Sequence, residues 1–275
     1  MRPPYGANCL VTIGAVSYAV MESSELGGSD WVEVLNGPLR LRCWWAEPDI
    51  VVNDIESKSS INRIYIVLPE VFGVNGWVRS VADRLAAHGH PALAVPLFAR
   101  TAPDLELAYE PSDLAQGRLH KDATTTEQIL ADVAAAVSWL GARYPRAAVH
   151  VVGFCFGGHA AFLAATLSGV EHAFDFYGAG VSRMRPGGGE PSLALLPEIQ
   201  GQLTCVFGTA DPLIPAEDRE AIEAALSKAD PAGQRLRFLE CGGADHGFMC
   251  EARKSFDPQA SAQGWRLLLA GDPVA

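Results

Sequence analysis

A cysteine enclosed by glycines, between a strand and a helix, constrains this chain more than any other feature. Residues 148–152 form an apolar, β-branched run, and residues 160–165 predict a buried helix. Between them lies the segment Gly153-Phe154-Cys155-Phe156-Gly157-Gly158. A strand, then Gly-x-Cys-x-Gly, then a helix is the nucleophile-elbow pattern with cysteine in the serine position.

This pattern has a steric and an electrostatic reason. The turn is so tight that the residues two before and two after its centre must be small, as Gly153 and Gly157 are. Cys155 is then expected to point out of the sheet at a helix N-terminus, where unpaired N–H groups favour a thiolate. The alternative is a tight strand-to-helix turn that contains an ordinary buried cysteine.

Length and composition exclude several classes of protein. A chain of 275 residues, 49% hydrophobic and 19% charged, is long enough to bury a full core. The net charge of -11 and the absence of a basic run argue against nucleic acid as a partner. The sequence has no signal-peptide pattern and no apolar run near the roughly 20 residues that span a bilayer, so no membrane partner is expected.

The cysteines and histidines give no metal-ligand spacing. Six cysteines are scattered along the chain without a Cys-x-x-Cys pair, which indicates reduced thiols and a cytoplasmic setting. No metal and no cofactor is expected.

Strands and helices alternate through most of the chain, which predicts an α/β protein with a mostly parallel, doubly wound sheet flanked by helices. An N-terminal β-hairpin is expected at 31–45 because Asn36-Gly37 suits a two-residue turn. Residues 1–30 are interpreted as an extension of unknown role, and 31–275 as a single domain. Further strands are expected at 64–69, 91–96, 173–178, 203–208 and 235–239, and helices at 78–88, 127–140, 217–228 and 260–269.

Several chemically useful residues directly follow predicted strands. They are Glu70, Arg100, Cys155, Asp211 and His246. Parallel sheets present functional loops at the carboxyl ends of their strands, so one edge of the sheet is expected to gather these side chains. The order nucleophile, acid, histidine is the one that α/β-hydrolases use for a catalytic triad.

The sequence offers another role for Asp211 and a local argument that His246 is not a core residue. Asp211 precedes Pro212 and could cap a helix, whereas His246 lies in a Gly-rich loop with no apolar face to bury it. The backbone N–H groups of Phe156 and Val71 are predicted to form an oxyanion hole. The other histidines are interpreted as structural or surface residues: His88, His90, His120, His150, His159 and His172.

Read together, these residues resemble the dienelactone hydrolase (carboxymethylenebutenolidase) family of the α/β-hydrolase superfamily. The segments that carry the resemblance are Glu70-Val71-Phe72-Gly73-Val74-Asn75, Leu97-Phe98-Ala99-Arg100 and the cysteine elbow, with Asp211 and His246. The resemblance covers roughly residues 33–269. It implies hydrolysis of a small ester or enol-lactone through a Cys-His-Asp triad and an acyl-enzyme, with maleylacetate as the product in aromatic degradation.

The resemblance also implies roles for residues around the triad. Glu70 would take the proton of the Cys155 thiol when substrate binds, although a surface-loop carboxylate is the alternative. Arg100 would bind the substrate carboxylate with its planar guanidinium, and Phe72 would contact the substrate. The family has a second arginine four residues after the histidine. This chain has Cys250 there, and Arg253 is the candidate replacement.

Two further functions stay open from the sequence. One is a broad-specificity carboxylesterase or thioesterase on the same fold. The other is a non-catalytic small-molecule binding protein that keeps the pocket without turnover. In each case the partner is a small molecule, and the protein is expected to be a monomer or a small homo-oligomer.

Overall fold

The computed structural model describes residues 28–48 and 61–270. Most of the predicted extension at 1–30 lies outside the described residues. The hairpin begins at Ser29, two residues earlier than predicted. No helix in the described ranges is long and apolar enough to cross a bilayer.

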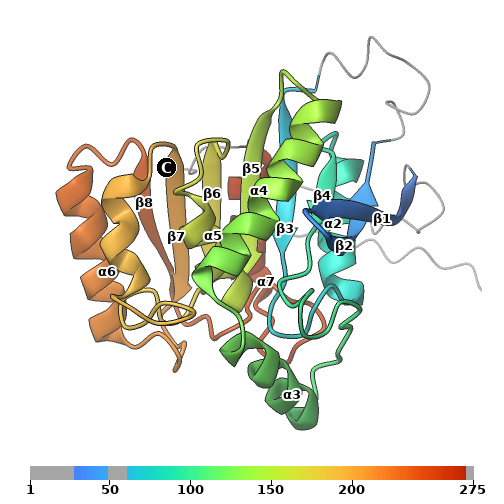
Figure 1. Cartoon of the computed structure of the whole chain (residues 1–275). Helices are drawn as coiled ribbons and strands as arrows, with labels where there is room; N and C mark the ends of the chain where they lie inside the picture. The colour runs from blue at the N-terminus through green and yellow to red at the C-terminus, as the bar shows by residue number, and fades with distance from the viewer. Residues whose placement is uncertain (1–27, 49–60, 271–275) are drawn as a thin grey trace, which may run out of the picture.

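The described strands form a single sheet of eight in the order β1-β2-β4-β3-β5-β6-β7-β8 (Figure 1). The hairpin strands β1 and β2 pair antiparallel, β2 also pairs antiparallel with β4, and every other neighbouring pair is parallel. The strands are β1 (Ser29–Asn36), β2 (Leu39–Ala46), β3 (Arg63–Leu68), β4 (Ala92–Ala94), β5 (Ala148–Phe154), β6 (His172–Phe176), β7 (Gln202–Gly208) and β8 (Leu236–Cys241).

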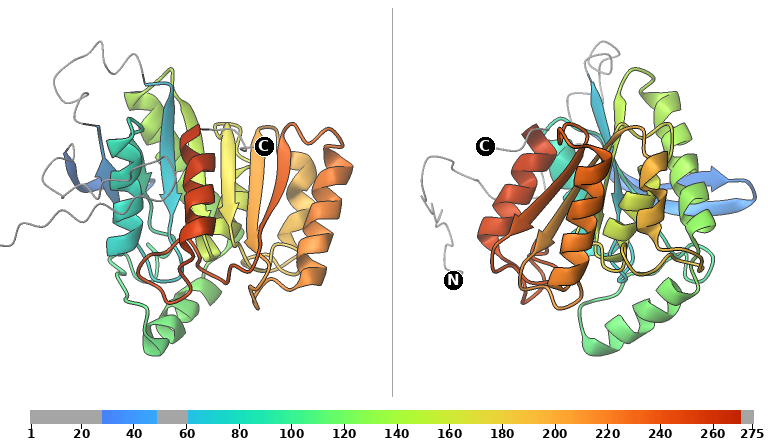
Figure 2. Two further views of the ribbon diagram at one scale, coloured as in Figure 1. Left: turned by 180° about the vertical axis from the view of Figure 1, so that it is seen from behind. Right: turned by 90° about the vertical axis from the view of Figure 1, so that its left-hand side faces the viewer.

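Helices cover both faces of the sheet. In Figure 2, α2 and α7 lie on one face, and α4, α5 and α6 lie on the other. The helices are α2 (Gly76–Ala87), α3 (Pro111–Asp122), α4 (Thr126–Arg143), α5 (Phe156–Ala164), α6 (Ala216–Ala229) and α7 (Pro258–Ala270), with a short 3-10 helix η2 (Ser192–Glu198). The mostly parallel sheet with flanking helices and an N-terminal hairpin confirms the predicted architecture.

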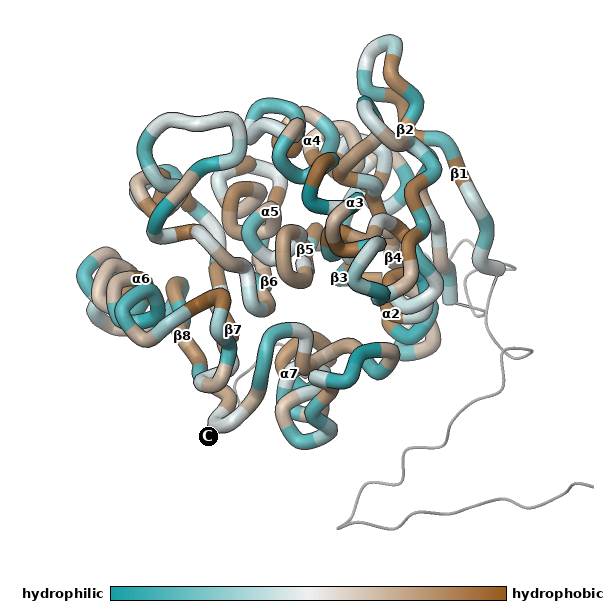
Figure 3. The backbone as a smooth tube through the Cα atoms, turned by 90° about the horizontal axis from the view of Figure 1, so that it is seen from below, coloured by the Kyte–Doolittle hydropathy of each residue, from teal (hydrophilic) through white to brown (hydrophobic). Residues whose placement is uncertain are grey.

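The core lies between these layers. All residues of β6 and all residues of β3 after Arg63 are buried, because parallel strands are covered on both faces. In Figure 3 the central strands β5 and β6 lie between α5 on one side and α7 on the other. The apolar runs of the sequence are therefore the inner strands, as expected.

Helix α3 departs from this layered arrangement. It lies beyond the carboxyl ends of the central strands, where Figure 1 shows it apart from the other helices. Pro111 at its first turn and a capping box between Glu110 and Asp113 begin the helix. Within α3 only Gly117 is buried. Helix α3 is therefore a surface excursion between β4 and α4.

Candidate active site

The elbow is as tight as the sequence requires. Cys155 has φ 55° and ψ -118°, a strained conformation for a residue other than glycine. A Cβ atom on Gly153 would lie 1.8 Å from the Gly157 carbonyl oxygen. A Cβ atom on Gly157 would lie 2.3 Å from the Leu68 carbonyl oxygen. Both contacts are with backbone, so only glycine fits at either position.

The elbow leaves Cys155 between the end of β5 and the start of α5. Its backbone N–H donates to the Phe176 carbonyl at 3.0 Å, which ties the turn to the end of β6. The residue is partly exposed and its thiol is free. Cys155 is the N-cap of α5, so its sulfur is at the positive end of the helix dipole.

His246 and Asp211 lie side by side and are hydrogen-bonded. His246 Nδ1 lies 2.7 Å from Asp211 Oδ2, and both side chains are almost fully buried. The expectation that nothing would bury His246 was wrong, because the Tyr177 ring packs against the imidazole at 5.2 Å. His246 Nε2 is buried and has no hydrogen-bond partner among the described residues. Burial lowers the pKa of His246, but the nearby Cys155 sulfur and the Asp211 carboxylate outweigh it, so the pKa is raised overall. The imidazole is thus placed to hold a proton beside the thiol.

Asp211 does not cap a helix, which was its alternative role. Helix α6 begins at Ala216, five residues later, and its N-cap is Pro215. Asp211 Oδ1 instead accepts a hydrogen bond from the Leu213 N–H at 2.8 Å, closing a local turn. One carboxylate oxygen therefore fixes the loop, and the other faces His246.

The two backbone N–H groups that the sequence suggested for an oxyanion hole, those of Val71 and Phe156, have no partner in the described chain. Both residues line the same cavity as Cys155. Phe156 is the first residue of α5, where an N–H has no partner within the helix.

The loop that carries Val71 is held by the segment 105–109. Gly73 and Glu106 form an isolated antiparallel bridge, and the Leu107 N–H donates to the Phe72 carbonyl at 2.9 Å. Gly73 has φ 77°, and a Cβ there would lie 1.9 Å from the Leu105 carbonyl oxygen, so this position also requires glycine.

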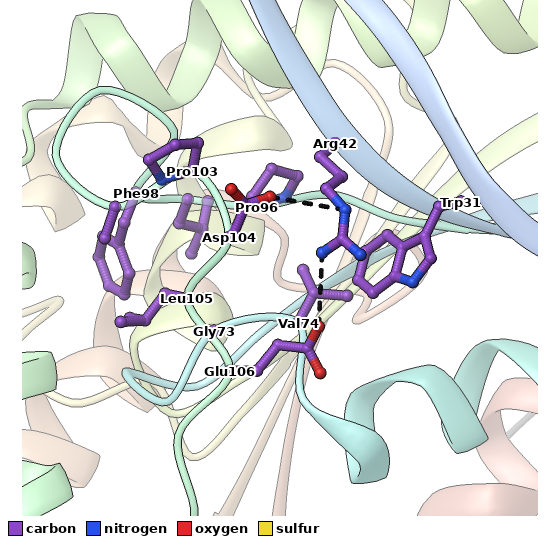
Figure 4. A pocket seen from close by; sticks show the side chains of 12 residues that line it. Trp31, Arg42, Gly73, Val74, Pro96, Phe98, Pro103, Asp104, Leu105 and Glu106 are labelled. Atoms are coloured by element: carbon purple, nitrogen blue, oxygen red, sulfur yellow. Dashed lines mark hydrogen bonds and ion pairs between the residues drawn. The ribbon is translucent and has the colours of Figure 1, made fainter.

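Figure 4 shows how this segment is fixed to the hairpin. Arg42 from β2 lies over the Trp31 ring at 3.5 Å and reaches Asp104 and Glu106 at 3.5 and 3.4 Å. The space enclosed by these residues is only about 10 Å³, too small for a ligand. The residues that enclose this small space therefore hold the loop that carries Val71 in place.

Glu70 is buried and paired with a cation. It is 1% exposed, and its Oε1 accepts a hydrogen bond from Arg253 Nη1 at 2.7 Å. Glu70 Oε2 has no partner among the described residues. Burial raises the pKa of Glu70, and Arg253 and His246 oppose that rise. A surface-loop carboxylate is thereby excluded, and Glu70 lies within the electrostatic reach of the histidine.

Arg253 reaches this position because Gly247 leaves room for it. A Cβ on Gly247 would lie 2.5 Å from Arg253 Nη1. Cys250 is buried beside Glu70 and Tyr109, and burial raises the pKa of its thiol to about 12.

The sequence did not single out Tyr177, whose buried hydroxyl has no partner in the described chain and whose ring packs on His246 at 5.2 Å.

A cavity of about 270 Å³ opens in front of Cys155. Three of its lining residues are cationic and the others are mostly apolar. They are Val71, Phe72, Leu114, Arg118, Lys121, Cys155, Phe156, His159, Ala179, Met184, Leu213, His246 and Arg253. The described residues contain no group of three or more His, Cys, Asp or Glu side chains that could hold a metal ion.

The structure does not bring Arg100 into this cavity. Its guanidinium makes two hydrogen bonds to Asp132 on α4, at 2.6 and 3.0 Å. Asp132 is 1% exposed and needs a charged partner. Arg100 is thus occupied by a structural ion pair, whereas Phe72 and Arg253, the other two predicted substrate contacts, do line the cavity.

His159 lines the cavity but is fully bonded. Its Nδ1 lies 3.0 Å from the Ala179 carbonyl and its Nε2 lies 2.7 Å from Ser192 Oγ. Burial lowers its pKa to about 4. The ring is therefore a neutral part of the wall, consistent with the structural role that the sequence suggested.

Two cations of α3, Arg118 and Lys121, were not singled out from the sequence. With Leu114 they have the spacing i, i+4, i+7, which puts all three on one helix face. That spacing was the available signal, but nothing in the sequence showed that this face turns toward Cys155.

Comparison with known proteins points to one family. The sequence model of the Dienelactone hydrolase family matches residues 55–270. A Synechocystis protein provisionally named carboxymethylenebutenolidase is 38% identical over 205 residues, which cover 74% of this chain and 82% of that protein. The carboxymethylenebutenolidase of Pseudomonas putida is 29% identical over 203 residues, covering 72% and 80%.

A solved structure supports the same fold. A Klebsiella pneumoniae protein, provisionally named dienelactone hydrolase, superposes with a TM-score of 0.75 at 23% identity and covers 88% of this chain and 96% of its own. The family match spans most of the chain, and the 38% identical relative extends over nearly as much. The chain therefore belongs to the dienelactone hydrolase family, in the α/β-hydrolase superfamily, and is a hydrolase that acts on carboxylic esters or lactones.

Proposed function

We propose that this enzyme hydrolyses a small ester or enol-lactone through a Cys155-His246-Asp211 triad and a thioester intermediate. The observation that carries the proposal is the arrangement around one cavity. The elbow cysteine and a histidine bonded at 2.7 Å to a buried aspartate line the same cavity. A nucleophile, a base and a group that orients the base are the three parts that acyl transfer requires.

In the first half of the reaction, the Cys155 thiolate attacks the substrate carbonyl carbon and a C–S bond forms. The carbonyl oxygen takes up the negative charge and is stabilised by the N–H groups of Phe156 and Val71. The C–O bond to the leaving group then breaks. The oxygen departs as an enolate from an enol-lactone, or takes a proton from His246 if it is an alkoxide.

In the second half, water attacks the thioester carbonyl. His246 Nε2, whose opposite nitrogen is held by Asp211, accepts the water proton. The C–S bond breaks, the carboxylic acid leaves, and Cys155 recovers its thiol or thiolate. An enolate leaving group that stays bound can take the same proton.

Glu70 is proposed to take the Cys155 proton when substrate enters. Its unpaired Oε2 and its burial support this role, because a desolvated carboxylate is a stronger base than an exposed one. Arg253 holds the other oxygen at 2.7 Å and stabilises the charged form. A thiolate formed only with substrate present would also be protected from oxidation.

Maleylacetate, formed from dienelactone in aromatic degradation, is the product we propose first. A broad carboxylesterase or thioesterase is the second candidate, favoured by the position of Arg100. With that guanidinium bound to Asp132, the cavity lacks the arginine that the family resemblance implied for a compact carboxylate.

Steady-state hydrolysis separates these functions. We expect wild-type protein to turn over cis- or trans-dienelactone or 4-nitrophenyl acetate, and Cys155→Ser to lose that activity. Fast dienelactone turnover would support the family reaction, and turnover of the simple ester alone would support the second candidate. Ligand binding without turnover of any compound would refute the hydrolytic proposal in favour of a non-catalytic binding protein.

A cytoplasmic setting is proposed from the thiols. The five cysteines in the described ranges are free, and four of them are buried. An enzyme that depends on a reduced elbow thiol suits a reducing compartment.

A further inference from the structure

The cavity mouth is apolar and open. Met184 and Leu213 line it and are each 40% exposed, which makes them two of the few large hydrophobic side chains at the surface of the described chain. Leu114 of α3 and Phe156 of α5 are further apolar residues that line the cavity. Exposed apolar side chains around a concave site are typical of a surface that a ligand covers.

The charges on this wall all have one sign. Arg118, Lys121 and Arg253 line the cavity, and no aspartate or glutamate is among its lining residues. This is notable in a chain of net charge -11. A cationic cavity in an acidic protein favours an anionic ligand and disfavours a cationic one.

The three cations differ in how they are paired. Arg253 is committed to Glu70 at 2.7 Å. Among the described residues, the ion-pair partner of Lys121 Nζ is the neighbouring, 67% exposed side chain of Asp122 at 2.6 Å. Arg118 makes no hydrogen bond or ion pair with any residue in the described ranges, so its five donors are free for a ligand.

Helix α3 is held close to the oxyanion hole by a single glycine. A Cβ on Gly117 would lie 2.2 Å from the Val71 carbonyl oxygen. This close approach seats the helix directly on the loop that carries one oxyanion donor. Arg118, the next residue, is therefore held at the cavity by a contact that no larger side chain allows. Lys121 lies one turn further on and is near His159, since it contributes to the lowered pKa of that ring.

On the basis of the proposed function, we propose that Arg118 and Lys121 of α3 select esters that carry a carboxylate at the far end of an apolar body. The apolar body would lie along Leu114, Met184 and Leu213, and the carboxylate would reach the α3 cations at the mouth. The preferred substrates are thus half-esters or half-thioesters of dicarboxylic acids, or esters whose leaving group ends in a carboxylate. These molecules are longer than a compact lactone with its carboxylate next to the ring.

Matched ester pairs test this proposal. Mono-4-nitrophenyl suberate and 4-nitrophenyl octanoate have the same leaving group and chain length but differ in one terminal charge. Mono-4-nitrophenyl glutarate and 4-nitrophenyl valerate form a shorter pair. Phenyl butyrates with and without a 4-carboxylate place the charge on the leaving group. The quantity measured is kcat/KM for each member, corrected for spontaneous hydrolysis.

Three variants assign any preference to α3. Arg118→Gln and Lys121→Gln remove one cation each, and Arg40→Gln removes an exposed arginine of β2 outside the cavity. We expect each α3 variant to reduce the anionic-to-neutral ratio of kcat/KM by roughly fivefold to tenfold in at least one pair, the size of one partly exposed charge-assisted bond. The Arg40→Gln ratio should stay unchanged, and in the α3 variants the kcat/KM of the neutral esters should fall by less than that of the anionic esters.

The outcomes separate this inference from the proposed function. Equal kcat/KM for anionic and neutral esters in all three pairs, or a preference that survives both α3 substitutions, would overturn the inference while leaving Cys155 hydrolysis intact. Loss of neutral and anionic turnover in parallel would mean that α3 is only structural and would overturn it as well. Failure of the proposed function itself would appear as turnover that persists in Cys155→Ala.

Discussion

Because Glu70 and Arg253 form a buried ion pair, the loss of unfolding free energy caused by Arg253→Met depends on pH. Glu70 is 1% exposed, and Arg253 Nη1 supplies the only hydrogen bond that its carboxylate accepts among the described residues. In Arg253→Met the carboxylate either stays charged in an apolar site or takes up a proton. Leaving a buried charge without its partner costs about 3–5 kcal/mol of unfolding free energy, which is the upper limit for this change.

The sign follows from the folded-state pKa of Glu70. Burial raises it above the reference value of 4.5, and removing Arg253, which opposes that rise, raises it further. A carboxyl whose folded pKa is raised stabilises the fold below the unfolded pKa, and this stabilisation is lost as pH rises through the folded pKa. As the pH rises, Arg253→Met loses more of this stabilisation than the wild-type protein does. The difference in unfolding free energy between the two proteins therefore grows with pH.

We expect Arg253→Met to lower the unfolding free energy by about 1 kcal/mol near pH 5 and by about 3 kcal/mol near pH 8. Urea unfolding at both pH values, under reducing conditions, measures this difference. Glu70→Gln combined with Arg253→Met should abolish the pH dependence. The exposed pair of Arg40 and Glu33 provides a control, since Arg40→Met should cost under about 1 kcal/mol at either pH. Equal deficits of Arg253→Met at pH 5 and pH 8 would refute the reasoning.

Three more predictions concern single positions. Asp211→Asn should reduce kcat by about 10⁴-fold without unfolding the protein, because an amide facing His246 Nδ1 favours the wrong tautomer; a loss under tenfold would contradict the triad. Gly153→Ala should yield little folded protein by circular dichroism, since its Cβ would lie 1.8 Å from a carbonyl oxygen. The control is Gly141→Ala in α4, whose Cβ would meet nothing within 4 Å; its unfolding free energy should stay the same or rise by about 0.5–1 kcal/mol. Arg100→Gln should reduce thermal stability because Asp132 loses its charged partner and keeps only the Asn36 amide among the described residues, yet KM should change less than twofold; a tenfold rise in KM would restore the predicted role of Arg100 in substrate binding.

The sequence predicted the parts of this molecule that depend on local patterns. Apolar β-branched runs became the inner strands, since a strand covered on both faces needs no polar alternation. Gly153 and Gly157 pointed to a tight elbow because only a missing Cβ satisfies that turn. Chain order then predicted that His246 and Asp211 belong together, and their side chains are hydrogen-bonded.

What the sequence could not supply depends on contacts between distant segments. The pairing of Arg100 with Asp132 joins a loop to a helix 32 residues away, and nothing near either residue indicates it. The direction in which α3 faces depends on the seat of Gly117 on Val71. The approach of Arg253 to Glu70 requires a glycine at position 247, six residues before the arginine. Contacts between distant side chains therefore determine which residues line the cavity, whereas the local sequence pattern determines the elbow.

The most direct test of the account is to find the acyl group. Wild-type enzyme mixed with excess 4-nitrophenyl butyrate and quenched in acid within milliseconds should show, by intact mass spectrometry, the added mass of one butyryl group. Peptide mapping should place that group on Cys155, and Cys155→Ala should show neither the adduct nor turnover. An acyl group on another residue, or hydrolysis that persists in Cys155→Ala, would contradict the thioester mechanism.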